Sequence, residues 1–433
     1  MAVMDEHGTQ KQWKNVNGHI IPSKKFKTVT LELKFKTLID RDTITRRAIL
    51  PFVLRKGSKR YPSAALIQNK LDDLYGASLE ISGHKAGSYH IMNFHIEIPN
   101  EKFILEDQDI FGETLAFLKE IAFRPNIEND AFDETITSRE KETITKYLQS
   151  IKDNKMQYAN IRLVDEMATG ERYQIHPFGY LEDMSYIDGK SLYTYYKHIV
   201  ENDQIDLFIV GDVDPNEMDY VVKEHLDGFR KQTGNNTIQP EVETIHPITH
   251  RKPYEVIEED SVQQAKLHMG YRTNTAYKDA DFASLILCNT ILGGHPGAKL
   301  FLNVREKHSL AYYAASTIDF FSDKLFIYSG ISPDDYEKAR TIIEEQVKAV
   351  KDGNFTDDEM KEAKTMVVNQ HVASLDNAEG IIDLLYQQQL GNKKRPVDQL
   401  LEEVKALTKE DVIEIANKLQ LDTVFLLTSK EVR

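Results

Sequence analysis

Apolar and polar residues alternate along two short segments, and this alternation predicts strands. The segments are VTLELKF (29–35) and NFHIEIP (93–99), in which every second residue is apolar. A period of two places one face of a strand in the core and leaves the other face polar. We therefore expect His95 and Glu97 on a wetter face. The run IDLFIVGDVDP (205–215) is more continuously apolar and ends in Gly-Asp turn chemistry, which indicates a further strand.

Amphipathic segments between these strands predict helices. The segment PSAALIQNKLDDLYGA (62–77) opens with Pro-Ser start signals and stops at its glycine, and residues 129–155 form a long pattern with one highly charged face. Residues 334–354 and 356–375 predict two more helices, each with an Asp or Thr available as a cap.

A stretch without sustained period divides the chain into two comparable halves. It is rich in Gly, Asn, Thr and Pro and reads DGFRKQTGNNTIQPEVETIHPITHRKP. We therefore predict an N-terminal extension (1–25), a first domain (26–228), a linker (229–253) and a second domain (254–433). Three segments of the first half have counterparts in the same order in the second half: 69–82 and 302–316, 127–144 and 355–372, and 187–211 and 407–429. Such ordered matches indicate a duplicated α+β unit.

Composition excludes several classes of protein. The 433 residues are 41% hydrophobic and 28% charged, as in globular proteins, and the net charge of −15 argues against a general nucleic-acid binder. No apolar run approaches the ~18 to 20 residues that span a membrane. The single cysteine, Cys288, allows no intramolecular disulfide, and its apolar surroundings indicate a buried small side chain. With no apolar leader at the N-terminus, we expect a cytoplasmic protein.

A glycine loop followed by basic and aromatic residues is the strongest candidate for function. The segment LGGHPGAKLFLNVREKHSLAYY (292–313) places Arg305 seven residues before Tyr312, behind Gly293, Gly294 and Gly297. Each feature also has a structural explanation. Arg305 could pair with Glu306, Tyr312 could be a half-buried strand residue, and the loop could be a helix C-cap and turn.

With this segment the chain resembles the pitrilysin/insulinase-like metallopeptidases, which include the mitochondrial processing peptidase subunits. The resemblance also rests on RKGSKRYPS (55–63) and on HPFGYLEDMSYI followed by LYTYYKHIVENDQIDLFIVGDVDP (176–215), and it extends from about residue 25 onward. It implies an α+β fold of two homologous domains, each an antiparallel-rich sheet packed with helices. His295 and Pro296 depart from the small residues that are usual in the family's loop.

The zinc motif of the family is missing. Active members carry H-x-x-E-H on the first long helix, where two His one turn apart bind zinc and the Glu polarises a water. The helix after RKGSKRYPS contains no histidine. The only His pair four residues apart, His246 and His250, lies in the predicted linker and encloses a proline. We therefore expect no metal in this chain.

Other candidate ligands have simpler interpretations. His84, His90 and His95 lie in one hairpin-like region, with His90 and His95 on opposite faces, and are predicted to be surface polar residues. Glu140 and Glu142, on the helix where the family places its later ligand, are predicted to be solvated charges.

The resemblance implies two homologous halves that close around a chamber, with zinc on one half and an Arg and a Tyr on the other. Arg305 and Tyr312 match the family's spacing, and the three glycines would let a peptide backbone approach. The chain is then expected to be the zinc-free subunit of a heterodimer, to bind peptide substrate as a strand added to a sheet edge, and to act on a site whose zinc is held by a homologous partner. The alternative is a catalytically inert structural or peptide-binding homologue, for example a homodimer.

Overall fold

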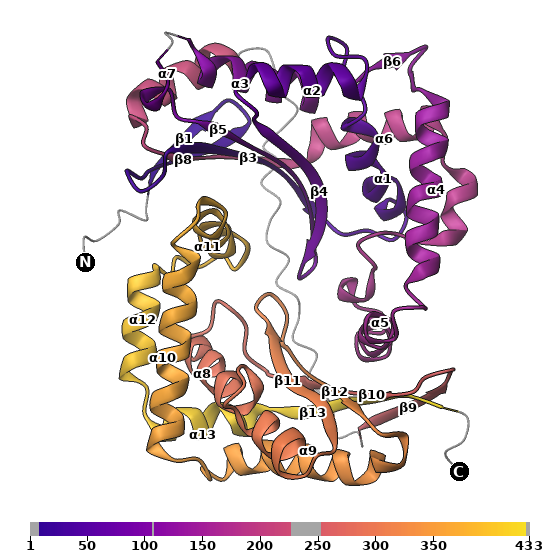
Figure 1. Cartoon of the computed structure of the whole chain (residues 1–433), viewed down its shortest axis with the longest axis vertical. Helices are drawn as coiled ribbons and strands as arrows, with labels where there is room; N and C mark the ends of the chain where they lie inside the picture. Colours follow the sequence, from indigo (N-terminus) through magenta and orange to yellow (C-terminus); the bar gives the residue numbers. More distant parts are fainter. Residues whose placement is uncertain (1–7, 106–107, 227–252, 430–433) are drawn as a thin grey trace. The chain divides into compact units, whose positions relative to one another are not determined.

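Two compact units make up the chain, which is shown in Figure 1 as a computed structural model that describes residues 8–105, 108–226 and 253–429. Unit 1 comprises Met1–Gln149, Ile175–Pro240 and Asp376–Leu385. Unit 2 comprises Ser150–Gln174, Glu241–Leu375 and Tyr386–Arg433. The predicted linker, apart from Pro253, lies outside the described residues.

Unit 1 is built around a six-stranded sheet in the order β1-β2-β8-β3-β5-β4. Its strands are β1 (Thr9–Trp13), β2 (Val16–Pro22), β3 (Thr28–Leu38), β4 (Ser78–Ala86), β5 (Tyr89–Pro99) and β8 (Gln204–Gly211). Its helices are α1 (Ile44–Leu54), α2 (Ala64–Asp73), α3 (Ile110–Phe123), α4 (Glu134–Ser150), α6 (Gly189–Asn202) and α7 (Pro215–Leu226), and a small hairpin joins β6 (Ile127–Glu128) to β7 (Ala131–Phe132).

Unit 2 is built around a five-stranded sheet in the order β11-β12-β10-β13-β9. Its strands are β9 (Tyr254–Glu259), β10 (Ala265–Arg272), β11 (Ala311–Asp319), β12 (Lys324–Ile331) and β13 (Gln420–Thr428). Its helices are α5 (Lys155–Met167), α8 (Phe282–Gly293), the π-helix η4 (Phe301–Lys307), α9 (Tyr336–Lys351), α10 (Asp357–Ser374), α12 (Val397–Ala406) and α13 (Lys409–Lys418). Helix α11 (Ala378–Leu390) begins in unit 1 and ends in unit 2.

The two sheets share one topology, which confirms the predicted α+β fold of two homologous domains. The order β2-β8-β3-β5-β4 in unit 1 corresponds to β9-β13-β10-β12-β11 in unit 2. In each unit the first of these strands pairs in parallel with the second, and all the following pairs are antiparallel. The segments matched in the sequence occupy equivalent places, because α4 corresponds to α10, and α6 with β8 corresponds to α13 with β13.

The chain forms two strands before the first predicted one. Residues 9–22, which the sequence analysis placed in an N-terminal extension, form β1 and β2 of the unit 1 sheet. Val16 and Ile20 are buried at alternate positions, and the ring of Trp13 fills the space beside Gly18. The indole Nε1 of Trp13 donates to Asp219 of α7 at 2.8 Å. Short strands with mixed polar residues give only a weak alternation, which is why the pattern did not predict them.

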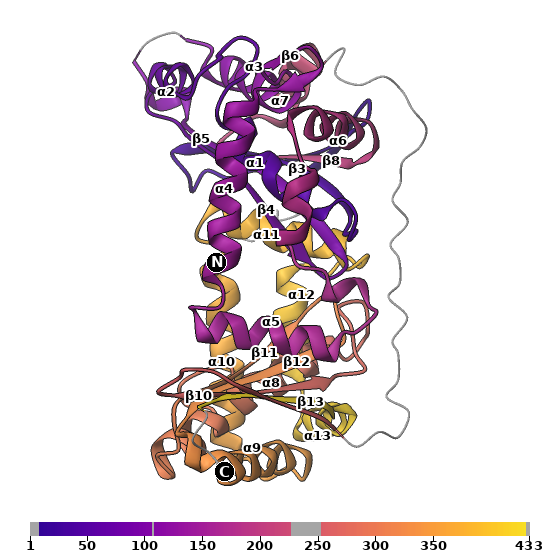
Figure 2. The same cartoon turned by 90° about the vertical axis from the view of Figure 1, so that its right-hand side faces the viewer.

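One helix from the first half of the sequence packs in unit 2. The long helix predicted over 129–155 is shorter than expected, because Ala131–Phe132 form β7 and α4 ends at Ser150. A separate helix, α5, starts after Asn154, whose side chain caps it. Helix α5 crosses one face of the unit 2 sheet (Figure 2), where Leu163 and Met167 pack with Phe326 and Phe425. The opposite face is covered by α8, α9 and α13. The first domain predicted at 26–228 therefore contains a segment, 150–174, that belongs to unit 2.

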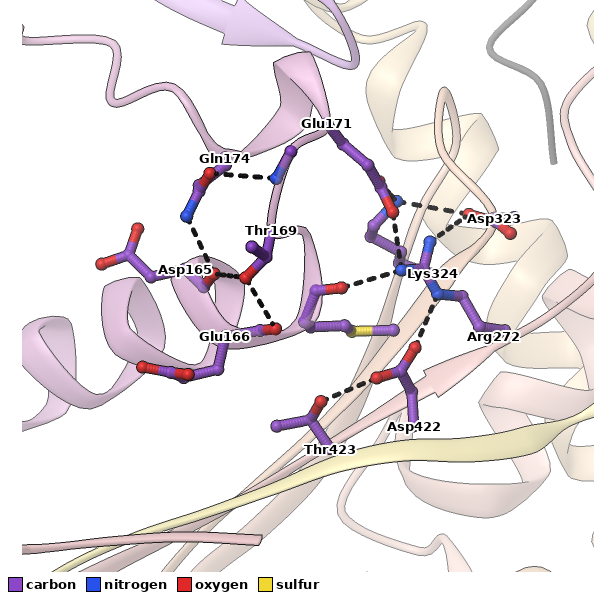
Figure 3. A network of polar contacts seen from close by, with 12 residues as sticks. Asp165, Glu166, Thr169, Glu171, Gln174, Arg272, Asp323, Lys324, Asp422 and Thr423 are labelled. Atoms are coloured by element: carbon purple, nitrogen blue, oxygen red, sulfur yellow. Dashed lines mark hydrogen bonds and ion pairs between the residues drawn. The ribbon is translucent and has the colours of Figure 1, made fainter. Parts of the chain in front are cut away.

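A buried ionic network fixes the end of α5 to the unit 2 sheet (Figure 3). Arg272 of β10 bonds Glu171 at 2.7 Å and Asp422 at 2.9 Å, and its Nη2 donates to the carbonyl of Met167 at 2.8 Å. Lys324 pairs with Glu171 at 2.8 Å and with Asp323 at 3.2 Å. Arg272 and Lys324 are almost fully buried, so each charge depends on these partners.

Candidate functional site

The glycine loop of unit 2 begins where α8 ends against the sheet. A Cβ on Gly293 would lie 2.6 Å from the backbone nitrogen of Ser316 and 2.7 Å from Leu300 Cδ1. Gly293 therefore lets the end of α8 approach β11, and the residue is itself buried. Gly294 is exposed and Gly297 is half-buried, and none of the three glycines has a positive φ. The close approach at Gly293 is to the protein's own strand. At Gly294 and Gly297 a Cβ would lie 2.9 Å from Thr290 Cα and 2.8 Å from Glu362 Oε1, so all three glycines relieve contacts within the chain.

Side chains tie this loop to the start of α10. Lys299 pairs with Glu359 at 3.0 Å, and Glu359 also closes the capping box of α10 with Thr356. His295 Nδ1 accepts a hydrogen bond from Gly297 N at 3.0 Å within the loop. The loop that follows α8 is therefore held in one conformation, including the His295 and Pro296 positions that depart from the family pattern.

Arg305 and Tyr312 lie on two irregular elements that follow the loop. Arg305 is on the π-helix η4, a rare form that often occurs at functional sites. The chain then turns through Ser309, whose φ of 52° is unusual for a residue with a side chain. The register of β11 with β12 shifts between Ala311 and Tyr313, so that Tyr312 occupies a bulge. Bulges redirect side chains, and Tyr312 is 75% exposed while Tyr313 is half-buried.

The guanidinium of Arg305 lies near two aromatic rings. Its Cζ is 4.6 Å from the centroid of Phe301 and 5.7 Å from that of Tyr312, which are cation–π distances. Its Nε also pairs with Glu306 at 3.3 Å, which is the ion pair that the alternative explanation of Arg305 predicts. The structure thus brings Arg305 and Tyr312 together at the surface. The hydroxyl of Tyr312 and the guanidinium N–H groups of Arg305 are both hydrogen-bond donors there. Such groups can bind carbonyl oxygens or a developing oxyanion.

The described part of unit 1 does not offer the ligands that zinc requires. The first helix of unit 1 is α1, which precedes RKGSKRYPS. The H-x-x-E-H motif was expected on the next helix, α2. Neither helix contains a histidine, and α1 is largely apolar with Pro51 inside it. Within the residues that the structure describes, no three His, Cys, Asp or Glu side chains converge as a metal site would need. The residues present therefore do not fit a catalytic zinc.

Glu140 differs from the prediction, whereas Glu142 agrees with it. Glu140 is 2% exposed rather than solvated, and its carboxylate lies 3.3 Å from Lys56 Nζ and 3.9 Å from Arg55 Nη2. These cations follow α1 and neutralise the buried charge of α4. Glu142 is exposed and pairs with Lys146 of the next turn at 2.6 Å.

The prediction of three surface histidines is wrong for two of them. His84 is exposed, but His90 is fully buried, and its Nδ1 accepts a hydrogen bond from Arg47 Nε at 2.9 Å. Burial, and then the charge of Arg47, hold the pKa of His90 well below its usual range.

His95 lies on the opposite face of β5, as its odd spacing from His90 predicts, and it contacts Glu32 at 3.1 Å. Burial opposes the charged form of His95 most strongly. The hydrogen bond to Glu32, together with the charges of Glu32, Glu379 and Glu97, outweighs burial and raises the pKa of His95. On the face expected to be wetter, His95 is buried with Glu32 and Lys34, which pair with each other, whereas Glu97 is half-buried. His246 and His250 lie outside the described residues. Cys288 is buried as predicted, and burial raises its pKa to about 12.

Comparisons with known proteins place the chain and its fold in a family. Residues 186–367 match the family described as Peptidase M16 inactive domain. The chain is 38% identical over 416 residues to the "Probable inactive metalloprotease YmfF" of Bacillus subtilis, and the match covers 96% of each chain. The chain belongs to the M16, or pitrilysin-like, peptidase family. This confirms the resemblance inferred from the glycine loop and the segments around it.

Solved structures of M16-like proteins share the architecture. A conserved protein from Enterococcus faecalis has a TM-score of 0.89 and 32% identity, with 99% of this chain and 100% of that chain covered. A peptidase M16 inactive domain from Pseudomonas fluorescens has a TM-score of 0.77 at 16% identity, with coverage of 98% and 99%, which shows the shared fold alone. Among the described residues of this M16 chain, no helix is both long and apolar enough to cross a membrane.

Proposed function

We propose that this M16 chain is the zinc-free subunit of a two-chain peptidase, and that it lends Arg305 and Tyr312 to the active site of a homologous partner that binds zinc. The observation that carries the proposal is the exposed pair itself, with the guanidinium 5.7 Å from the ring of a tyrosine that a bulge turns outward. A chain whose own helices lack zinc ligands has no use for such donors unless the metal comes from another chain.

The chemistry assigns each group a role. When water attacks a peptide carbonyl, negative charge develops on oxygen, and donors already in place lower the barrier. The hydroxyl of Tyr312 supplies one such hydrogen bond, and Arg305 binds a neighbouring substrate carbonyl or carboxylate in a fork. The exposed Gly294 gives the peptide backbone room beside it.

The sheet edge supports binding of an extended peptide. Strand β11 is the first in the order of its sheet, and β12 is its strand neighbour. A peptide that adds beside β11 would run past Tyr312 and use the main-chain groups along that edge.

The relatives support a partnership of unlike chains. YmfF of B. subtilis is named a probable inactive metalloprotease, and the same organism has a relative named "Uncharacterized zinc protease YmxG", 23% identical over 299 residues. We infer that this chain likewise pairs with a zinc-bearing homologue, and in the cytoplasm, since one cysteine suits a reducing compartment. The name of YmfF equally favours a second candidate function, an inert peptide-binding homologue that acts without a zinc-bearing partner.

Reconstitution with a zinc-bearing homologue from the same organism tests the proposal. We expect peptide hydrolysis by the mixture, and we expect Tyr312→Phe to lower kcat by about 100-fold, because loss of one oxyanion donor costs about 3 kcal/mol. Arg305→Ala should lower kcat/KM without weakening assembly, measured by sedimentation.

Matched variants control for effects on the fold. Lys307→Ala changes a cation on the same π-helix, and Tyr254→Phe removes an exposed hydroxyl at the other edge of the sheet, so both should leave turnover unchanged. Full turnover in Arg305→Ala and Tyr312→Phe would exclude the role in trans and leave the inert homologue as the function.

A further inference from the structure

A second surface feature lies in unit 1 and plays no part in the proposed function. It is a hollow of about 1020 Å³, formed by the loop after α1 together with α3, α6 and α7. The loop is the segment RKGSKRYPS, which follows α1 as the glycine loop follows α8 in the equivalent position of unit 2. Aromatic and basic side chains dominate the lining, which includes Tyr61, Phe123, Tyr193 and Tyr196.

The basic side chains of the hollow outnumber the acidic ones. Lys59, Arg60, Lys119 and Arg124 line it against Glu120 and Glu224. Glu120 is buried, and its Oε1 accepts a hydrogen bond from the backbone N–H of Arg60 at 2.7 Å. Arg124 Nη1 lies 3.9 Å from Glu120 Oε2, beyond hydrogen-bond distance.

Three of these cations are available to a ligand. Lys119 donates to the carbonyl of His225 at 2.7 Å, whereas Lys59, Arg60 and Arg124 are exposed. Among the residues described in this structure, none of these three side chains has an ion pair closer than 3.9 Å. In a chain with a net charge of −15, this local excess of positive charge is unusual.

The backbone holds these cations in place. Lys59 N donates to the carbonyl of Arg124 at 2.8 Å, and Ser58 forms a β-bridge with Pro125. Tyr61 N donates to Ser58 Oγ at 3.1 Å, which closes the loop on itself. Gly57 permits this turn, because a Cβ there would lie 2.9 Å from the carbonyl oxygen of Pro62. A ligand would therefore meet a preformed surface, which lowers the entropy lost on binding.

The aromatic wall is equally fixed. Tyr196 donates its hydroxyl to the carbonyl of Ala122 at 2.8 Å and stacks with Tyr193 at 6.1 Å between ring centroids. Tyr61 packs edge-on against Phe117 at 5.5 Å. Tyr196 fills the core, whereas Tyr193 is half-buried and presents its ring to the hollow.

We propose that this hollow binds an acidic segment of a polypeptide. Arginine forks match carboxylates, and aromatic walls accept the apolar side chains between them. The volume is at the upper end of the ~300 to 1,000 Å³ range of small-molecule pockets, which suits a chain segment better than a single anion. The site does not depend on the proposed function, since Arg305 and Tyr312 belong to unit 2.

Fluorescence anisotropy with a labelled peptide of alternating Glu and Tyr tests the proposal on the full chain. We expect saturable binding that weakens with salt, and no binding of the same peptide with Lys in place of Glu. The double variant Arg60→Glu/Arg124→Glu should weaken binding by about tenfold or more, because both forks then repel carboxylates. If that variant fails to fold, as judged by circular dichroism, Arg60→Gln/Arg124→Gln replaces it and should weaken binding in the same direction.

Lys24→Glu/Lys190→Glu provides the matched control, since both residues are exposed in unit 1, do not line the hollow, and change the net charge by the same amount. Its affinity should equal that of the wild type. Equal weakening in both double variants would overturn the proposal, because binding would then reflect net charge alone. Displacement of the peptide by ATP or inorganic phosphate at matched ionic strength, or tighter binding of a single-stranded oligonucleotide, would also overturn it in favour of a different anion.

Discussion

The side chain of Arg305 is positioned by an aromatic ring as well as by an ion pair. Its guanidinium lies 4.6 Å from the centroid of Phe301 and carries one contact to an exposed acid, Glu306. Exposed ion pairs contribute roughly 0 to 1 kcal/mol, so the stacked position does not depend on Glu306. The donors of Arg305 therefore stay available for a substrate. The family resemblance led us to expect that Arg305 and Tyr312 act together, but the bulge that exposes Tyr312 has no signal in the sequence.

Buried histidines are the residues for which the sequence was least informative. Alternation correctly put His90 and His95 on opposite faces of β5, but it could not show that both faces are covered. That depends on partners distant in sequence, such as Arg47 for His90 and Glu32 for His95. Polar residues enter a core when such partners exist, and no local pattern encodes them.

His268 of β10 gives the protein an acid-sensitive site in unit 2. It is fully buried, lies edge-on to Tyr328 at 4.9 Å, and burial lowers its pKa to about 3. The unfolded chain binds a proton at this histidine near pH 6.5, whereas the folded chain does not. Its contribution to stability is therefore complete above pH 6.5 and is lost as the pH falls from 6.5 towards 3, by about 2 kcal/mol between pH 7 and pH 5.

The variant His268→Phe keeps the ring and removes the titration. Between pH 7 and pH 5, the free energy of unfolding of the variant should fall by about 2 kcal/mol less than that of the wild type. Urea denaturation of both proteins at each pH measures the difference. Other groups titrate equally in both proteins, so the difference isolates His268. The same pH dependence in both proteins would show that His268 is not held neutral in the fold.

Elements were predicted well where their pattern is strong. The helices expected over 334–354 and 356–375 are α9 and α10, and the predicted Thr cap of α10 is present as a capping box. The segments that were matched between halves proved equivalent because the same hydrophobic pattern builds the same strand order twice. Helix α5 was not predicted, because the helix expected over 129–155 ends where α5 begins. Its amphipathic pattern would show which face of the helix is buried but not which sheet buries it.

The ionic network around Arg272 is what we expect to hold α5 in unit 2. Removing Arg272 leaves Glu171, Asp323 and Asp422 close together with Lys324 as their remaining cation. Loss of one partner from a buried network costs roughly 3 to 5 kcal/mol, because the remaining charges lose their compensation. Arg272→Ala should therefore lower the free energy of unfolding by that amount. Urea denaturation followed by far-UV circular dichroism measures the change.

Arg340→Ala is the matched control in the same unit. Arg340 pairs with Glu255 at 2.7 Å and with Glu344 at 2.9 Å on α9, nearer to solvent. Its removal should cost at most about 1 kcal/mol. If both variants lost a similar amount of unfolding free energy, the burial of the Arg272 network would add nothing to its contribution to stability.

At the scale of the whole molecule, the chain keeps an M16 fold, and among the residues that the structure describes no group of His, Cys, Asp and Glu converges to hold a metal. The helix α1 is apolar where ligands would be needed, and the buried Glu140 is neutralised by neighbouring cations. The candidate catalytic residues, Arg305 and Tyr312, lie at the surface of unit 2 and do not form a complete active site by themselves. The proposed sharing of roles between two chains remains a prediction, which rests on the histidines missing from one helix and on the residues present after α8.

Metal analysis of the chain purified alone, combined with a peptide-hydrolysis assay of the same sample, tests this account most directly. After incubation with zinc and removal of the free ion, we expect no stoichiometric metal and no turnover, with hydrolysis arising only when the zinc-bearing homologue is added. One tightly held zinc per chain, together with hydrolysis by the isolated chain that a chelator abolishes, would contradict the account.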